Sequence, residues 1–193
     1  MRNIVILGSS GSIGRQAVDV IARDPELRIS GLAVRSSISL LREQTERFRP
    51  EAVCVFEREA AERFSSFGLP VRVLSGMEGL IELSEMEGCD ELLVSLVGMI
   101  GIEPTIAAIR KRKRILLANK ETLVCAGHLI MPLLKEYCTE LRPIDSEHSA
   151  IWQSLMGEDP ESLERILLTA SGGPFRGRSR AERSLKIRQR RMH

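Results

Sequence analysis

Short apolar runs alternate along this chain with segments whose apolar residues recur at helical spacing. The segment 3–7 is continuously apolar after Asn3 and stops at a glycine cluster, as a buried parallel strand does. After Gly14 the helical spacing persists until Asp24-Pro25 ends it, because proline disfavours a helical conformation in the preceding residue. The alternation then repeats, predicting strands over 28–34, 52–56, 71–74, 91–97, 114–118, 140–144 and 163–169, and helices over 38–48, 57–66, 76–86, 102–112, 121–136 and 148–156.

Strands separated by helices of about ten residues are typical of βαβ units. We therefore predict an α/β fold with an open, mostly parallel sheet. Residues 176–193 lack apolar periodicity, and we expect a basic tail without stable structure.

Basic charge is concentrated in that tail. Residues 176–193 carry eight of the 28 basic side chains and only one of the 26 acidic ones, so the other 175 residues are acidic overall. The sequence pI of about 8.4 therefore reflects the tail, and we expect no specific nucleic-acid partner.

The sequence shows no signal for export or membrane insertion. The apolar run at the start is short and lacks a charged head and a cleavage site, and no other run approaches the ~20 apolar residues of a membrane span. The four cysteines have no paired spacing, so we expect small, buried or half-buried residues in a reducing cytosol. These features predict a cytoplasmic protein that does not contact membranes.

A glycine-rich loop, GSSGSIG over residues 8–14, joins the first predicted strand to the first predicted helix. Glycines let the backbone turn sharply and approach a pyrophosphate, and the helix amino terminus supplies N–H donors. The spacing is GxxGxxG and not the commoner GxGxxG, so a plain tight turn capped by serine is the alternative interpretation.

The end of the second predicted strand reads Val34-Arg35-Ser36-Ser37, where folds that bind NAD usually carry an acidic residue. An arginine and two hydroxyl groups suit a 2′-phosphate, so the sequence favours NADPH over NADH. A solvated surface arginine is the alternative.

Two carboxylates one residue apart, Asp145 and Glu147, follow another predicted strand. Carboxylates at a strand end can share a hard cation such as Mg²⁺ or Mn²⁺ and leave room for a chelating substrate. Asp-Ser-Glu is also a good helix amino-terminal cap, and the two interpretations are compatible. Asn119-Lys120-Glu121 and the segment around Ser171 also follow strands, and they offer groups for a cofactor and a phosphate.

Together these segments resemble the 1-deoxy-D-xylulose 5-phosphate reductoisomerase family. The matching pieces are ILGSSGSIG, LLANKETLV, PIDSEHSAIWQSL and LLTASGGPF, in the family's order and between Arg2 and Phe175. The resemblance implies a Rossmann-type, NADPH-binding domain over residues 1–120 and the first part of an α/β (or α+β) catalytic domain over residues 121–175. It also implies a homodimer. It implies an NADPH-dependent oxidoreductase and isomerase of the non-mevalonate pathway, which makes isoprenoid precursors.

The resemblance also implies a role for each matching residue. NADPH is expected to contact Ser10, Gly11, Ser12, Ile13, Asn119 and Glu121, with Arg35, Ser36 and Ser37 near its 2′-phosphate. Mg²⁺ or Mn²⁺ is expected on Asp145 and Glu147, which with Lys120 form the implied catalytic set. The sugar phosphate substrate is expected to contact Lys120, Ser146, Glu147 and Ser171. In the family the metal holds substrate oxygens during the rearrangement, and hydride transfer then gives 2-C-methyl-D-erythritol 4-phosphate.

The chain departs from the family's pattern in places. The family usually has threonine at the position of Ser10, and a glycine, a basic residue and an asparagine where Arg35-Ser36-Ser37 stand. Family chains are longer, and residues 177–193 do not resemble their continuation. We therefore expect a truncated chain that is inactive alone.

Two other classes of protein remain open. A different NADP-dependent dehydrogenase predicts activity without a divalent ion. The second class is a non-catalytic fragment that binds a nucleotide, or a module whose tail binds nucleic acid, and either would show no turnover. Binding of nucleic acid would depend on the salt concentration and would be lost on removal of residues 177–193.

Overall fold

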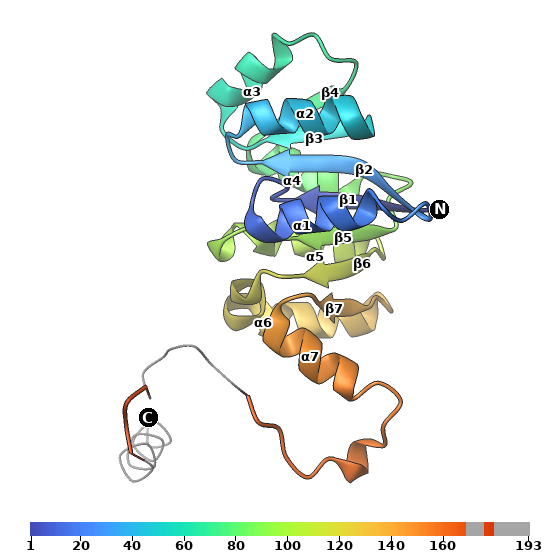
Figure 1. Ribbon diagram of the computed structural model, residues 1–193, viewed down its shortest axis with the longest axis vertical. Coiled ribbons are helices and arrows are strands. Elements are labelled where there is room, and N and C mark those ends of the chain that lie inside the picture. Colours follow the sequence, from blue (N-terminus) through green and yellow to red (C-terminus); the bar gives the residue numbers. More distant parts are fainter. Residues whose placement is uncertain (169–175, 180–193) are drawn as a thin grey trace. The chain divides into compact units, whose positions relative to one another are not determined.

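The computed structural model describes residues 1–168 and 176–179. The chain divides into two units, Met1–Ser149 and Ala150–His193. A seven-stranded sheet lies in the first unit (Figure 1). Its strands are β1 (Arg2–Leu7), β2 (Leu27–Val34), β3 (Ala52–Val55), β4 (Arg72–Ser75), β5 (Glu91–Val94), β6 (Arg114–Leu117) and β7 (Leu141–Pro143).

All neighbouring strands pair in parallel, in the order β4-β3-β2-β1-β5-β6-β7. The chain therefore runs outward from β1 to β4, returns to place β5 on the other side of β1, and runs outward again. Loops leaving β1 and β5 diverge at this reversal and open a crevice at the carboxyl ends of the strands, where α/β sheets bind ligands. The predicted Rossmann-type fold is confirmed.

Helices cover both faces of the sheet in the first unit (Figure 1). Within β1, Ile4 and Ile6 pack toward one face and Val5 and Leu7 toward the other. Because both faces are buried, the strands are continuously apolar. One face is covered by α1 (Ser12–Ile21), α2 (Ile38–Phe48) and α3 (Arg58–Ser65), and the other by α4 (Gly76–Glu85), α5 (Ile102–Arg110) and α6 (Lys120–Glu136).

Two predicted elements differ from the structure. The strand predicted over 91–97 ends at Val94, and its last residues lead into the short helix η1 (Gly98–Gly101). The strand predicted over 163–169 is wrong for residues 163–168, which have no regular structure. A strand needs a neighbour for its backbone hydrogen bonds, and none pairs with this segment in the described part of the chain.

The remaining elements are α7 (Ser146–Ser154) and η2 (Pro160–Ser162). Among the described helices, none has the length and hydropathy to cross a membrane. Cys54 and Cys89 are buried, as expected, whereas Cys125 and Cys138 are exposed.

The loop between β1 and α1 depends on two glycines. Gly8 has a φ of +91°, and a Cβ atom there would lie 2.7 Å from the carbonyl oxygen of Ser95. A Cβ atom at Gly14 would lie 2.1 Å from the carbonyl oxygen of Gly8, so α1 packs too closely for any side chain. At Gly11 the nearest atom would be 3.4 Å away, which is an ordinary contact.

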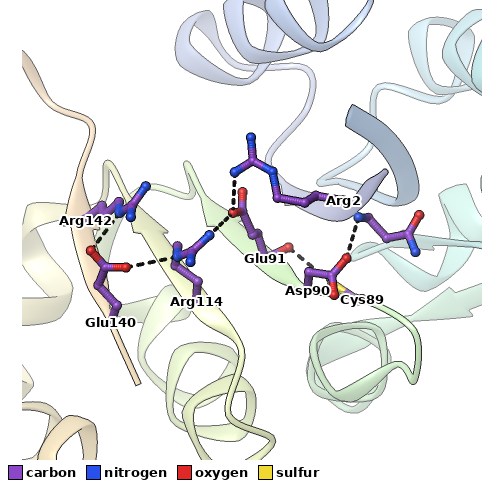
Figure 2. A network of polar contacts seen from close by, with 8 residues as sticks. Arg2, Cys89, Asp90, Glu91, Arg114, Glu140 and Arg142 are labelled. Carbon is purple, nitrogen blue, oxygen red and sulfur yellow. Dashed lines mark hydrogen bonds and ion pairs between the residues drawn. The ribbon is translucent and has the colours of Figure 1, made fainter. Parts of the chain in front are cut away.

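A series of ion pairs runs across neighbouring strands at their amino-terminal ends (Figure 2). Glu91, whose side chain is 4% exposed, accepts from Arg2 at 3.0 Å and pairs with Arg114. Arg114 also pairs with Glu140 at 3.1 Å, and Glu140 pairs with Arg142 at 2.8 Å. The ion pairs thus join β1, β5, β6 and β7 at the edge opposite the crevice.

Replacing Glu91 with Gln should lower the free energy of unfolding by about 1.5 kcal/mol, because the side chain loses two charge-assisted interactions. Glu140→Gln is the matched control at an exposed position, and it should cost under about 0.5 kcal/mol. Urea denaturation measures both free energies of unfolding. Equal losses in the two variants would contradict the larger contribution of Glu91 to stability.

Gly14→Ala should lower the free energy of unfolding by about 3 kcal/mol, because its methyl group overlaps the Gly8 carbonyl oxygen. Gly11→Ala, in the same loop, should change it by less than about 1 kcal/mol. Thermal denaturation of both variants checks this, and a stable Gly14→Ala protein would show that α1 can shift.

Candidate functional site

The glycine loop ends at an open helix amino terminus. Gly11 caps α1 without a side-chain hydrogen bond, and the first turn of this helix has no acidic residue. The first amides of α1 therefore remain available to an anion. Ser10 is half-buried, Gly11 and Ser12 are exposed, and Ile13 is 37% exposed, so all four predicted cofactor contacts reach the surface of the loop.

A cavity of about 480 Å³ lies at the carboxyl ends of β1, β2, β3 and β5. Its volume is within the range of small-molecule sites. Its walls are largely apolar, and the glycine loop and one arginine supply the polar part. The lining residues are Gly8, Ser10, Gly11, Val34, Arg35, Phe56, Leu80, Ser95, Leu96, Val97 and Ile100.

Arg35 lies at this cavity, and its side chain is 83% exposed. Its Nε atom pairs with Oε1 of Glu57 at 2.9 Å, which orients the guanidinium. Ser36 is half-buried, and Ser37 is the exposed cap of α2. Sequence reasoning did not identify Glu57; its only signal was its place just after the third strand.

The buried side chain of Asn119 connects the loop between β6 and α6 to the loop after β5 by hydrogen bonds. The residue is 2% exposed and caps α6, where its Oδ1 atom accepts from the Thr122 amide at 3.0 Å. Its Nδ2 atom donates to the carbonyl oxygens of Leu96 at 2.7 Å and Gly98 at 3.0 Å. Asn119 therefore fixes the loop after β5, and its contact with a cofactor stays a prediction.

The three residues of the predicted catalytic set are close together. Lys120 is the first residue of α6, and its Nζ atom lies 3.9 Å from Oε2 of Glu147 in the first turn of α7. Asp145 immediately precedes α7. Because β6 and β7 are adjacent and parallel, their carboxyl ends bring these side chains to one place.

Asp145 also caps α7, as the second interpretation of the motif expected. Its Oδ1 atom accepts from the backbone amide of His148 at 3.1 Å and contacts the His148 Nδ1 atom at 2.6 Å. Burial raises the pKa of Asp145, but these hydrogen bonds outweigh it and hold the pKa below its ordinary value. The carboxylate is therefore ionised at neutral pH.

Glu147 is ionised as well. Hydrogen bonds from its own backbone amide and from Ser146 lower its pKa, and the nearby charge of Lys120 acts in the same direction. Two ionised carboxylates are suitable ligands for a hard cation. No group of three or more candidate metal ligands gathers within residues 1–168 and 176–179.

The other predicted site residues are Glu121, Ser146 and Ser171. Glu121 and Ser146 are exposed at the starts of α6 and α7, and Glu121 Oε2 lies 3.3 Å from Asn119 Nδ2. Ser171 lies outside the described residues. The described residues thus form two groups, one at the cavity and one around Lys120, with Asn119 touching the loop between them.

A model of 1-deoxy-D-xylulose 5-phosphate reductoisomerase matches residues 4–127. A model of the C-terminal domain of the same enzyme matches residues 141–193. The second range includes 177–193, where we expected no resemblance to the family.

Curated relatives give the same family. The reductoisomerase of Lachnospira eligens is 49% identical over 184 residues, covering 94% of this chain and 48% of the relative. That of Lachnoclostridium phytofermentans is 51% identical over 186 residues, covering 94% and 47%. The chain thus spans about half the length of these relatives.

Solved structures agree in fold and sequence. The Zymomonas mobilis reductoisomerase in complex with NADPH is 35% identical, with a TM-score of 0.83 over 94% of this chain and 48% of that one. A DOX-P reductoisomerase in complex with magnesium is also 35% identical, with a TM-score of 0.81 over 91% and 47%. This chain therefore belongs to the 1-deoxy-D-xylulose 5-phosphate reductoisomerase family.

Proposed function

We propose that this chain supplies the NADPH site and two metal-binding carboxylates of an enzyme that converts 1-deoxy-D-xylulose 5-phosphate to 2-C-methyl-D-erythritol 4-phosphate. One observation carries the proposal. Lys120 groups with Asp145 and Glu147 at the carboxyl ends of the strands, the same end of the sheet that bears the glycine loop. A reductoisomerase needs a hydride donor and a Lewis acid beside one substrate.

In this proposal the cavity binds NADPH. The loop residues Ser10, Gly11, Ser12 and Ile13 hold the pyrophosphate against the amides at the start of α1. Arg35, Ser36 and Ser37 contact the 2′-phosphate, with Arg35 oriented by Glu57. The Zymomonas mobilis relative was solved with NADPH, which supports this assignment.

The residues around Lys120 hold the metal and the substrate. Asp145 and Glu147 suit Mg²⁺ or Mn²⁺ because both carboxylates are ionised, and relatives were solved with magnesium. When bound, the ion supplies Lewis-acid polarisation of substrate oxygens. Lys120 contributes a positive charge for substrate oxygens, and the exposed Ser146 hydroxyl offers a hydrogen bond.

His148 has a supporting role in this proposal. Its ring contacts Asp145 Oδ1, the carboxylate that is only 11% exposed, and so fixes the direction of a metal ligand. Asn119 and Glu121 are proposed to complete the nicotinamide side of the site, where the Asn119 amide holds the loop at Leu96.

Assembly and location follow the same reasoning. We propose a cytoplasmic homodimer that acts on a small sugar phosphate and has no specific nucleic-acid partner. Residues 1–120 are proposed as the NADPH domain and 121–175 as the start of the catalytic domain, although β7 extends the same sheet beyond residue 120. Ser171 is proposed as a substrate contact.

Arg35→Ala should weaken NADPH binding about tenfold and leave NADH binding unchanged, because only NADPH carries the 2′-phosphate. Arg42→Ala is the control, since Arg42 is another exposed arginine that pairs with a glutamate, Glu46. Titrations followed by nicotinamide fluorescence measure both constants. Equal losses for NADPH and NADH would remove Arg35 from the 2′-phosphate site.

A hybrid of residues 1–168 with the remaining half of a relative should catalyse NADPH-dependent conversion of the substrate when Mg²⁺ or Mn²⁺ is present. Glu147→Gln should lower its kcat/KM about a hundredfold through loss of a metal ligand, whereas the exposed control Glu158→Gln should not. A hybrid that binds NADPH yet shows no turnover contradicts the proposed reaction. Activity without a divalent ion points to another dehydrogenase.

A further inference from the structure

A buried polar pair connects the glycine loop to α2. Ser9 is 0% exposed and Gln44 is 6% exposed, although the neighbours of Ser9 in the loop reach the surface. The Ser9 hydroxyl donates to Gln44 Oε1 at 2.8 Å, and Gln44 Nε2 donates to the Ser9 carbonyl oxygen at 3.3 Å. The contact is thus reciprocal and uses both ends of the Gln44 amide.

This pair lies between the two parts of the proposed cofactor site. Ser9 belongs to the loop that faces the pyrophosphate, while Gln44 belongs to the helix that begins just after the proposed 2′-phosphate contacts. The backbone amides of Gly8 and Ser9 both donate to the carbonyl oxygen of Ala33 at 2.9 Å, near the end of β2. The glycine loop is therefore hydrogen-bonded both to β2 and to α2.

The stability that such a pair adds is small. A hydrogen bond exchanged with water contributes little net free energy, and an apolar pair of similar volume can replace a buried polar pair at little cost. A polar pair differs in being directional, because each donor must meet its acceptor along a fixed line. The pair therefore fixes the rotation of the Ser9 peptide group, and with it the path of the next residues in the loop.

We propose that Gln44 is a positioning residue for cofactor binding. Through Ser9 it sets the glycine loop relative to the start of α2, so that the loop amides and Arg35 reach two phosphates of one NADPH molecule. This inference rests on the proposed function of the cavity. It assigns a role in cofactor affinity and selectivity to a residue that lines no part of that cavity.

The test uses the 193-residue chain with Gln44→Leu and Ser9→Ala. Thr45→Val is the matched control, because Thr45 is also buried in α2 and its hydroxyl donates only within the helix, to Leu41 at 2.7 Å. NADPH and NADH dissociation constants are measured together with Tm. Gln44→Leu should weaken NADPH binding about tenfold, or ~1.4 kcal/mol, and narrow the preference for NADPH over NADH.

Thr45→Val should lower Tm without changing either dissociation constant. Ser9→Ala should weaken NADPH binding in the same direction, and the double variant should lose less than the sum of the single losses, because the two residues act as one pair. If Gln44→Leu fails to fold, Ser9→Ala decides the matter, since it removes a single hydroxyl group.

Unchanged NADPH binding by a folded Gln44→Leu or Ser9→Ala protein overturns the positioning role and leaves the proposed function standing. Equal weakening by Thr45→Val also overturns it, because the effect is then one of general packing. If the unmodified chain binds no NADPH, both the cofactor site and the positioning role are overturned.

Discussion

At the crevice between β1 and β5, the backbone of Gly8 lies against the carbonyl oxygen of Ser95, with no room between them for a side chain. The Ser95 hydroxyl closes the contact by donating to the carbonyl oxygens of Leu7 at 2.8 Å and Gly8 at 3.2 Å. Gly14 then packs against Gly8 and places α1. The turn, the open helix start and the cavity all depend on this approach of two backbones.

The amino-terminal and carboxyl-terminal ends of the strands carry different groups of charged residues. At the amino-terminal edge, the ion pairs centred on Glu91 join strands on both sides of the crevice. At the carboxyl-terminal edge, the strands release the chain into loops that carry Arg35, Lys120 and Asp145. Because parallel strands separate these edges by their full length, the stabilising charges do not compete with those proposed to bind ligands.

The alternation of apolar runs and helical spacing was enough to predict the fold and to bring Lys120, Asp145 and Glu147 to one edge, because parallel topology dictates that meeting. Individual side-chain contacts of residues outside the recognised motifs were not predictable from the sequence. Glu57 and Gln44 occur in segments with no motif, and only the packed structure shows what they touch. The strand expected over 163–169 is absent from 163–168, because an apolar run does not reveal whether a partner strand exists.

The pairing of β1 with β5 also has a consequence for biosynthesis. The Ser95 hydroxyl meets Leu7, a residue 88 positions earlier in the chain. At ribosomal rates of about 5–20 residues per second, β1 waits ~4–18 s for this neighbour to be synthesised. During that interval the side of β1 that later pairs with β5 is unpaired, and unpaired strand edges are prone to aggregation. The crevice between β1 and β5 can therefore form only once Ser95 has been synthesised, before β6 and β7 extend the sheet.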